Sequence, residues 1–159
     1  MSTRALYTFM GTRSNPGRFN VYKRYDGYPS GALAVLKETL NYAWPLPRYE
    51  ADEFAASFVA AAKNRGAEFE PGGVFFEHRG GGVRLMPAGD PAKVATKHCS
   101  DIEWRYEISF GPVAVGGDGL RVAAIEGSWW DGKAIQKRVF FGSLSEFEGW
   151  VHRGEGKEI

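Results

Sequence analysis

Alternating hydrophobic and polar residues predict a β-hairpin at the start of the chain. Residues 5–9 and 18–25 both alternate with period two, which is typical of strands. The segment between them, 11–17, is rich in Gly, Ser, Asn and Pro, the residues that form turns. We therefore expect two antiparallel strands joined by a long loop.

The longest alternating segment is 102–110. Trp104 and Tyr106 fall on one side of it, whereas Arg105 and Glu107 fall on the other. This pattern predicts a strand with one buried side and one side that faces water. Further strands are expected at 83–86, 120–126 and 134–141.

Two segments have helical spacing of apolar residues. The first includes Leu33 and Leu40 and runs up to 44–47, where two prolines stop it. The second begins near Ala51 and is expected to end at 64–66, which is Asn-Arg-Gly.

Ser143 and Glu146 have the spacing of a capping box, which predicts a last short helix. Residues 87–101 contain many turn formers and are expected to be irregular. Strands and helices are grouped along the chain, so the predicted fold class is α+β, a mainly antiparallel β-sheet of about five to six strands with two to three helices packed on one face. We expect one such domain over residues 1–152 and a flexible tail over 153–159.

Composition narrows the classes of function. The 159 residues include 20 Lys and Arg and 19 Asp and Glu, so the net charge is +1 and there is no overall excess of either sign. The one cysteine, Cys99, excludes an intramolecular disulfide and suits a reducing compartment. We find no pattern of a signal peptide or of a membrane span, and expect a cytoplasmic protein without membrane contact.

Residues with catalytic or metal-binding chemistry are few and scattered. His98 and Cys99 are adjacent, and no pair of His and Cys residues has the spacing of a metal site. We therefore expect no metal, no cofactor and no motif-defined catalytic residue. A small hydrolase or nucleotide-processing enzyme built on His98, Asp101 or His152 remains an alternative, since active sites can combine distant residues.

The N-terminal hairpin contains several basic residues and no acidic ones. Residues 1–25 contain no Asp or Glu, and tyrosines alternate with the cations. Such a hairpin could bind phosphates and stack bases, or the charges could simply protect an edge strand from aggregation. The candidate residues for nucleic-acid binding are Arg4, Arg13, Arg18, Lys23 and Arg24.

Two aromatic turns are candidates for contact with a partner. One is the segment 22–28, which precedes a helix, and the other is the pair of tryptophans at 129–130, where one ring should face each side of the sheet. Both turns could instead serve the fold, by making the turn or by covering the sheet edge. The candidate partner-binding residues are Tyr22, Arg24, Tyr25, Asp26, Tyr28, Trp129 and Trp130.

Several segments together resemble a group of small proteins from bacterial and phage genomes. These segments are Tyr22–Gly31, Ala43–Arg48, Glu50–Ala56, Gly80–Met86 and Asp101–Glu107. The resemblance transfers no catalytic residue, but it implies a bacterial or phage setting in which accessory proteins bind host machinery. We therefore expect a non-enzymatic binding protein, a phage-encoded accessory protein or inhibitor that acts on a host protein or nucleoprotein defence complex. A nucleic-acid-binding protein is the first alternative.

Overall fold

The computed structural model describes residues 3–69, 82–111, 119–129 and 135–154, which form six strands and four helices. The strands are β1 (Ala5–Met10), β2 (Arg18–Lys23), β3 (Val83–Leu85), β4 (Trp104–Phe110), β5 (Leu120–Ser128) and β6 (Ile135–Ser143). The helices are α1 (Pro29–Thr39), α2 (Ala51–Phe69), α3 (Pro91–His98) and α4 (Leu144–His152).

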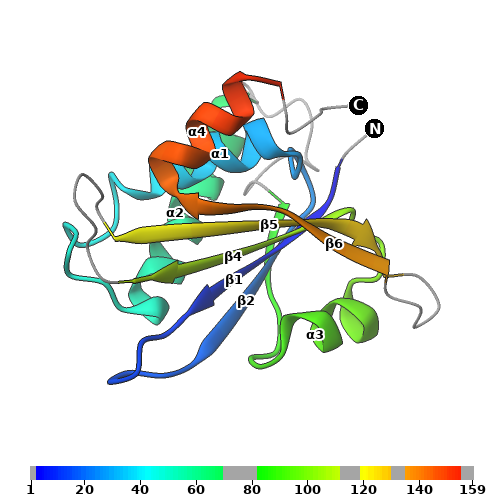
Figure 1. The fold of residues 1–159 in the computed structure, drawn as a ribbon, viewed down its shortest axis with the longest axis horizontal. Helices are drawn as coiled ribbons and strands as arrows, with labels where there is room; N and C mark the ends of the chain where they lie inside the picture. Colours follow the sequence, from blue (N-terminus) through cyan, green and yellow to red (C-terminus); the bar gives the residue numbers. More distant parts are fainter. Residues whose placement is uncertain (1–2, 70–81, 112–118, 130–134, 155–159) are drawn as a thin grey trace.

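All six strands belong to one mixed sheet with the order β3-β2-β1-β4-β5-β6 (Figure 1). β1 and β2 pair as the predicted antiparallel hairpin, and β4, β5 and β6 form an antiparallel meander. The two halves meet at β1 and β4, the one parallel pair among the described strands. The predicted α+β class and the predicted number of strands are therefore confirmed.

The first face of the sheet, on which Tyr7, Phe9 and Tyr106 lie, is covered by α1, α2 and α4. The rings of Tyr7 and Phe9 have their centroids 4.5 and 5.1 Å from that of Phe58, which projects from α2. Each such buried side chain stabilises the fold by about 1.5–3 kcal/mol through removal of apolar surface from water. This aromatic layer is the main core.

The second face of the sheet, on which Leu6, Tyr22 and Arg105 lie, carries α3. Val94 and Cys99 from this helix segment join Leu6 and Tyr22 in a second, smaller apolar cluster. Figure 1 shows α3 on the opposite side of the sheet from α1 and α4. Among the described residues, α3 is the one helix on this face.

The sequence analysis missed α3, because it treated residues 87–101 as irregular. The start of the helix has a clear chemical cause. The Asp90 side chain accepts a hydrogen bond from the Ala92 amide at 3.1 Å, and Pro91 occupies the first turn, where its missing N–H costs nothing. Lys97 and His98 in the last turn complement the helix dipole.

Other predicted boundaries were partly wrong. α1 ends at Thr39, so Leu40 caps the helix and is exposed rather than buried. α2 continues to Phe69 through the predicted stop at 64–66, because local propensity is a weak constraint on a helix that packs along a core. Ile102 precedes β4 and packs into the second cluster instead of the first.

The capping box at the start of α4 is confirmed, since Ser143 accepts a hydrogen bond from the Glu146 amide and Glu146 accepts one from the Ser143 amide. None of the described helices is long and apolar enough to cross a membrane. Residues 155–159 of the predicted tail lie outside the described residues.

Candidate functional site

Arginines gather on the second face of the sheet. Seven of the chain's 12 arginines lie there: Arg18, Arg84, Arg105, Arg121 and Arg138 within strands, and Arg4 and Arg24 directly beside β1 and β2. Strand register aligns three of them in one row across the sheet, in the order Arg84, Tyr22, Leu6, Arg105, Ile125 and Arg138. At about 4.8 Å per strand, this row spans roughly 24 Å.

A β-bulge adds an aromatic ring to this face. In β6, Arg138 pairs with Ile125 and Phe140 pairs with Ala124, so Val139 is an extra residue. The bulge shifts the alternation, and Arg138 and Phe141 consequently share the second face. Phe141 is 58% exposed, and the Arg138 guanidinium lies 5.2 Å from its ring centroid. An exposed ring beside a cation is suited to stacking with a planar group.

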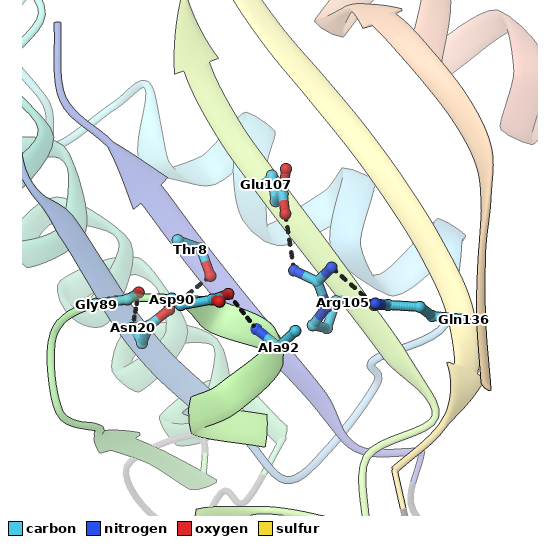
Figure 2. Close-up of polar contacts among 8 residues, drawn as sticks. All are labelled: Thr8, Asn20, Gly89, Asp90, Ala92, Arg105, Glu107 and Gln136. Carbon is cyan, nitrogen blue, oxygen red and sulfur yellow. Dashed lines mark hydrogen bonds and ion pairs between the residues drawn. The ribbon is translucent and has the colours of Figure 1, made fainter. Parts of the chain in front are cut away.

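Arg105, near the middle of the row, is buried and rigidly held. Figure 2 shows its guanidinium between two neighbours: it donates to Glu107 Oε2 at 2.8 Å and to Gln136 Oε1 at 3.0 Å. The residue is 5% exposed, which corrects the expectation that this side of β4 faces water. Glu107 neutralises Arg105, so the positive charge that this face presents to solvent comes from its exposed arginines, Arg18, Arg24, Arg84 and Arg138.

A second polar cluster fixes α3 to the sheet. The Asn20 side chain donates to the carbonyl oxygens of Pro87 and Gly89 at 2.9 and 3.1 Å, and Thr8 Oγ1 donates to Asn20 Oδ1 at 2.6 Å. Figure 2 shows this cluster next to the start of α3, where Asp90 caps the helix. Both Thr8 and Asn20 are buried, so the segment that precedes α3 is anchored at a defined place on β1 and β2.

The C-terminal end of α3 meets β2 and β3 at a polar pocket of about 280 Å³. In its wall, Asp101 forms an ion pair with Arg4 at 3.0 Å and accepts a hydrogen bond from the Tyr22 hydroxyl, also at 3.0 Å. The side chains that line it are Tyr22, Arg84, Met86, Lys97, His98, Cys99, Ser100 and Asp101. We call this site the α3 pocket.

Burial, and then nearby charge, shifts the pKa of two side chains at the α3 pocket. Burial, followed by the charge of Asp101 and its hydrogen bond, raises the pKa of Tyr22 to about 12, while Arg4 and Arg24 act in the opposite direction. Burial and then the charge of Asp101 also raise the pKa of Cys99 to about 12. The Cys99 thiol is therefore protonated at neutral pH, and its environment does not activate it as a nucleophile.

The predicted contact turn 22–28 is built mainly by backbone requirements. Asp26 adopts a positive φ of 56°, and the Tyr28 hydroxyl donates to its carboxylate at 3.1 Å. The Tyr106 hydroxyl donates to the Gly27 carbonyl at 2.6 Å from inside the core. Tyr25, Asp26 and Tyr28 are half-buried and Arg24 is exposed, so Arg24 is the residue of this turn that is most accessible to a partner.

The two predicted tryptophans do not form an exposed tip in the described part of the chain. Trp129 is completely buried in the second apolar cluster, which agrees with a packing role and removes it as a direct partner contact. The second predicted tryptophan, Trp130, lies outside the described residues.

The five predicted nucleic-acid contacts do not form one patch. Arg13 and Arg18 are exposed at the loop end of the hairpin, whereas Arg4 and Arg24 are at its other end beside the α3 pocket. Six residues of strand, roughly 20 Å, separate the two ends. Lys23 is buried and donates to the Tyr25 carbonyl, so it is a structural residue, contrary to the prediction.

Residues suggested for catalysis are brought together only in part. His98, Cys99 and Asp101 line the α3 pocket, but His152 is exposed on α4, which packs on the first face. Asp101 is already engaged by Arg4 and Tyr22. No group of three or more His, Cys, Asp or Glu residues that could hold a metal ion occurs in the described ranges.

An exposed apolar patch between α1 and α2 escaped the sequence analysis. It consists of Leu40, Tyr42 and Trp44, which are 37–44% exposed, and the Arg48 guanidinium stacks 3.7 Å from the Trp44 ring centroid. α1 ends at Thr39, so these side chains follow the helix and do not share its buried face. Trp, Tyr and Arg are the residues most enriched in interface hot spots.

No protein-family model matches this sequence, and no curated protein or solved structure matches it. Any assignment of function therefore rests on the geometry of the second face and its surroundings.

Proposed function

We propose that this chain is a non-catalytic binding protein whose second face contacts single-stranded nucleic acid, free or within a nucleoprotein complex. The observation that supports the proposal best is the separation of charge across the sheet. Seven arginines lie on the second face, where Glu107 and Asp101 neutralise Arg105 and Arg4, and where the charge of Arg121 acts on Glu146. The opposite layer is acidic: its described side chains include six carboxylates, from Glu38, Glu50, Asp52, Glu53, Glu146 and Glu148, against four permanent cations, from Lys37, Arg48, Lys63 and Arg153. A net charge of +1 conceals this asymmetry.

Phe141 and Arg138 favour a single strand over a duplex. Bases in a duplex are stacked on one another and cannot stack on a protein ring, whereas bases of a single strand can. The middle of the second face is covered by α3 and its apolar cluster, but at β6 the exposed Phe141 ring beside Arg138 offers both parts of single-strand binding, a stacking surface and a cation.

The resemblance to bacterial and phage proteins adds a biological setting to this proposal. In that setting the nucleic acid would belong to a host nucleoprotein complex, and the chain would act as an accessory protein or inhibitor. The engaged Asp101 and the protonated Cys99 thiol support binding in preference to catalysis.

The proposal is tested by the salt dependence of binding to a labelled single strand of about 12 nucleotides, followed by fluorescence anisotropy between about 50 and 200 mM salt. The double variant Arg18→Gln, Arg138→Gln should bind more weakly and lower the slope of log K against log salt by about 1.4, as expected for two lost phosphate contacts. The double variant Arg48→Gln, Lys63→Gln changes the net charge equally on the helix layer and should leave the slope unchanged. Equal effects of both double variants, or no binding at low salt, would refute the proposal.

Phe141→Ala tests the preference for a single strand. Loss of one stacking contact should weaken binding of the single strand by about 5-fold or more, with little change for a duplex of the same sequence. Equal loss for both would show that the ring does not stack on a base.

The exposed patch of Leu40, Tyr42 and Trp44 supports a second candidate function, direct contact with a protein. It lies on the helix side, so a chain that bridges protein and nucleic acid could use both surfaces. The test is capture from host lysate with and without nuclease. Partners retained after nuclease and lost with Trp44→Ala favour this function, and capture that depends entirely on nucleic acid opposes it.

A further inference from the structure

The α3 pocket differs from the rest of the second face because it is concave. Its volume of about 280 Å³ is at the lower limit of small-molecule sites, so it suits a single chemical group better than a whole ligand. Tyr22, Arg84 and Met86 form its sheet side, and residues 97–101 at the end of α3 form the other side. It is placed at one end of the row of arginines that crosses the sheet.

The pocket has an excess of positive charge. Asp101, its one carboxylate, is already paired with Arg4 at 3.0 Å and bonded to the Tyr22 hydroxyl. Arg84 and Lys97 are exposed at the rim, and neither makes an ion pair with a residue in the described part of the chain. Arg24 adds a third positive charge close to Tyr22. A guanidinium fork, an ammonium and the Ser100 hydroxyl thus surround a space whose one carboxylate, Asp101, is already engaged by Arg4 and Tyr22.

We infer that the α3 pocket binds the terminal phosphate of the strand, a phosphate monoester; this inference rests on the proposed function. A monoester carries about −1.5 to −2 charge at neutral pH and has three strong acceptor oxygens, whereas an internal phosphodiester carries one charge and continues in both directions. A pocket closed on one side by the end of α3 admits an end of a strand more easily than its middle. Arg84 is suited to two parallel hydrogen bonds with phosphate oxygens, and Lys97 acts as a point charge.

The experiment compares one single strand in three forms: with a 5′-phosphate, with a 3′-phosphate and with hydroxyls at both ends. We expect one phosphorylated form to bind the native chain at least about 5-fold more tightly than the hydroxyl form, which is a difference of roughly 1 kcal/mol in binding free energy. Lys97→Gln and Arg84→Gln should each reduce that preference. Lys93→Gln is the matched control, since Lys93 is exposed one turn earlier on α3 and does not line the pocket, and the preference should remain.

The outcomes separate this inference from the function on which it rests. Equal binding of all three forms, with the salt dependence retained, overturns the terminal-phosphate site and leaves the proposed function intact. A preference that survives in both Lys97→Gln and Arg84→Gln also overturns it, because the end then binds elsewhere. Absence of binding to every form refutes both the terminal-phosphate site and the proposed function. A nucleoside 5′-monophosphate that competes as strongly as the strand would support a phosphate monoester site and assign it to a free nucleotide.

Discussion

The two faces of the sheet use different chemistry to hold their helices. On the first face, α1, α2 and α4 pack through aromatic rings such as Tyr7, Phe58 and Phe147. On the second face, α3 is anchored by side-chain hydrogen bonds from Asn20, and its apolar cluster is smaller. Burial of apolar surface is non-directional and strong in sum, whereas hydrogen bonds fix position. By this comparison the first face supplies most of the stability, whereas the second face is a charged surface held at a defined position, which the proposed function uses for binding.

The largest expected loss of stability comes from removing an aromatic ring from the first face. Phe58→Ala should lower the free energy of unfolding by about 3–5 kcal/mol, because a completely buried ring that contacts Tyr7 and Phe9 leaves a cavity. Phe141→Ala on the second face is the matched control and should change stability by less than about 0.5 kcal/mol, since its ring is largely exposed. Urea denaturation measures both. Similar losses for the two variants would contradict the division.

The next largest effect concerns the anchor of α3. Asn20→Ala should cost about 1–3 kcal/mol, because it leaves the Thr8 hydroxyl and two carbonyl oxygens without their buried partner. Hydrogen exchange should show faster opening of α3 than of α1 in this variant. The exposed Asn41→Ala is the control and should leave both helices protected. If α3 kept its native protection in Asn20→Ala, the second face would not depend on this anchor.

The same comparison shows what sequence patterns could and could not predict. The hairpin, the strand 104–110 and the capping box at Ser143 are local features, and their patterns predicted them correctly. The signal for α3 was also local, Asp90 followed by Pro91, but the neighbouring turn formers obscured it.

The arrangement of the second face, the proposed binding surface, could not be predicted, because its residues meet through long-range pairing. Arg105 lies beside Leu6 only because β1 and β4 pair in parallel with one particular register. Arg138 and Phe141 share a face only because Val139 bulges; strict alternation places them on opposite sides. Neither the register nor the bulge has a distinct signature in the local sequence.

Alkaline pH should weaken the second face first. Burial raises the pKa of Cys99 from 9 to about 12. Above pH 9 the unfolded chain loses this proton while the folded chain retains it. The stability contribution is therefore complete below pH 9 and falls as the pH rises toward 12. Tyr22 adds to the loss above pH 10, since its pKa is also raised to about 12.

Cys99→Ala provides the check. The variant should lose less stability than the native chain between pH 8 and about pH 10, as measured by urea denaturation at each pH. Identical pH profiles would mean that the thiol ionises as readily in the folded chain as in the unfolded one.

The smallest expected change in the free energy of unfolding concerns the helix layer, at the start of α4. Ser143→Ala removes the hydroxyl that accepts the Glu146 amide at 3.1 Å and should lower the free energy of unfolding by about 1 kcal/mol. The Ser143 amide and then its hydroxyl hold the pKa of Glu146 below its usual range. The variant keeps the amide and loses the hydroxyl, so the pKa of Glu146 should rise but stay below its usual range. Ser145→Ala, two residues further on and exposed, keeps the capping box and should change neither quantity.

Because α4 packs on the first face, affinity for a single strand should be unchanged in Ser143→Ala. A parallel loss of binding would mean that the two faces are energetically coupled and that the division of roles fails.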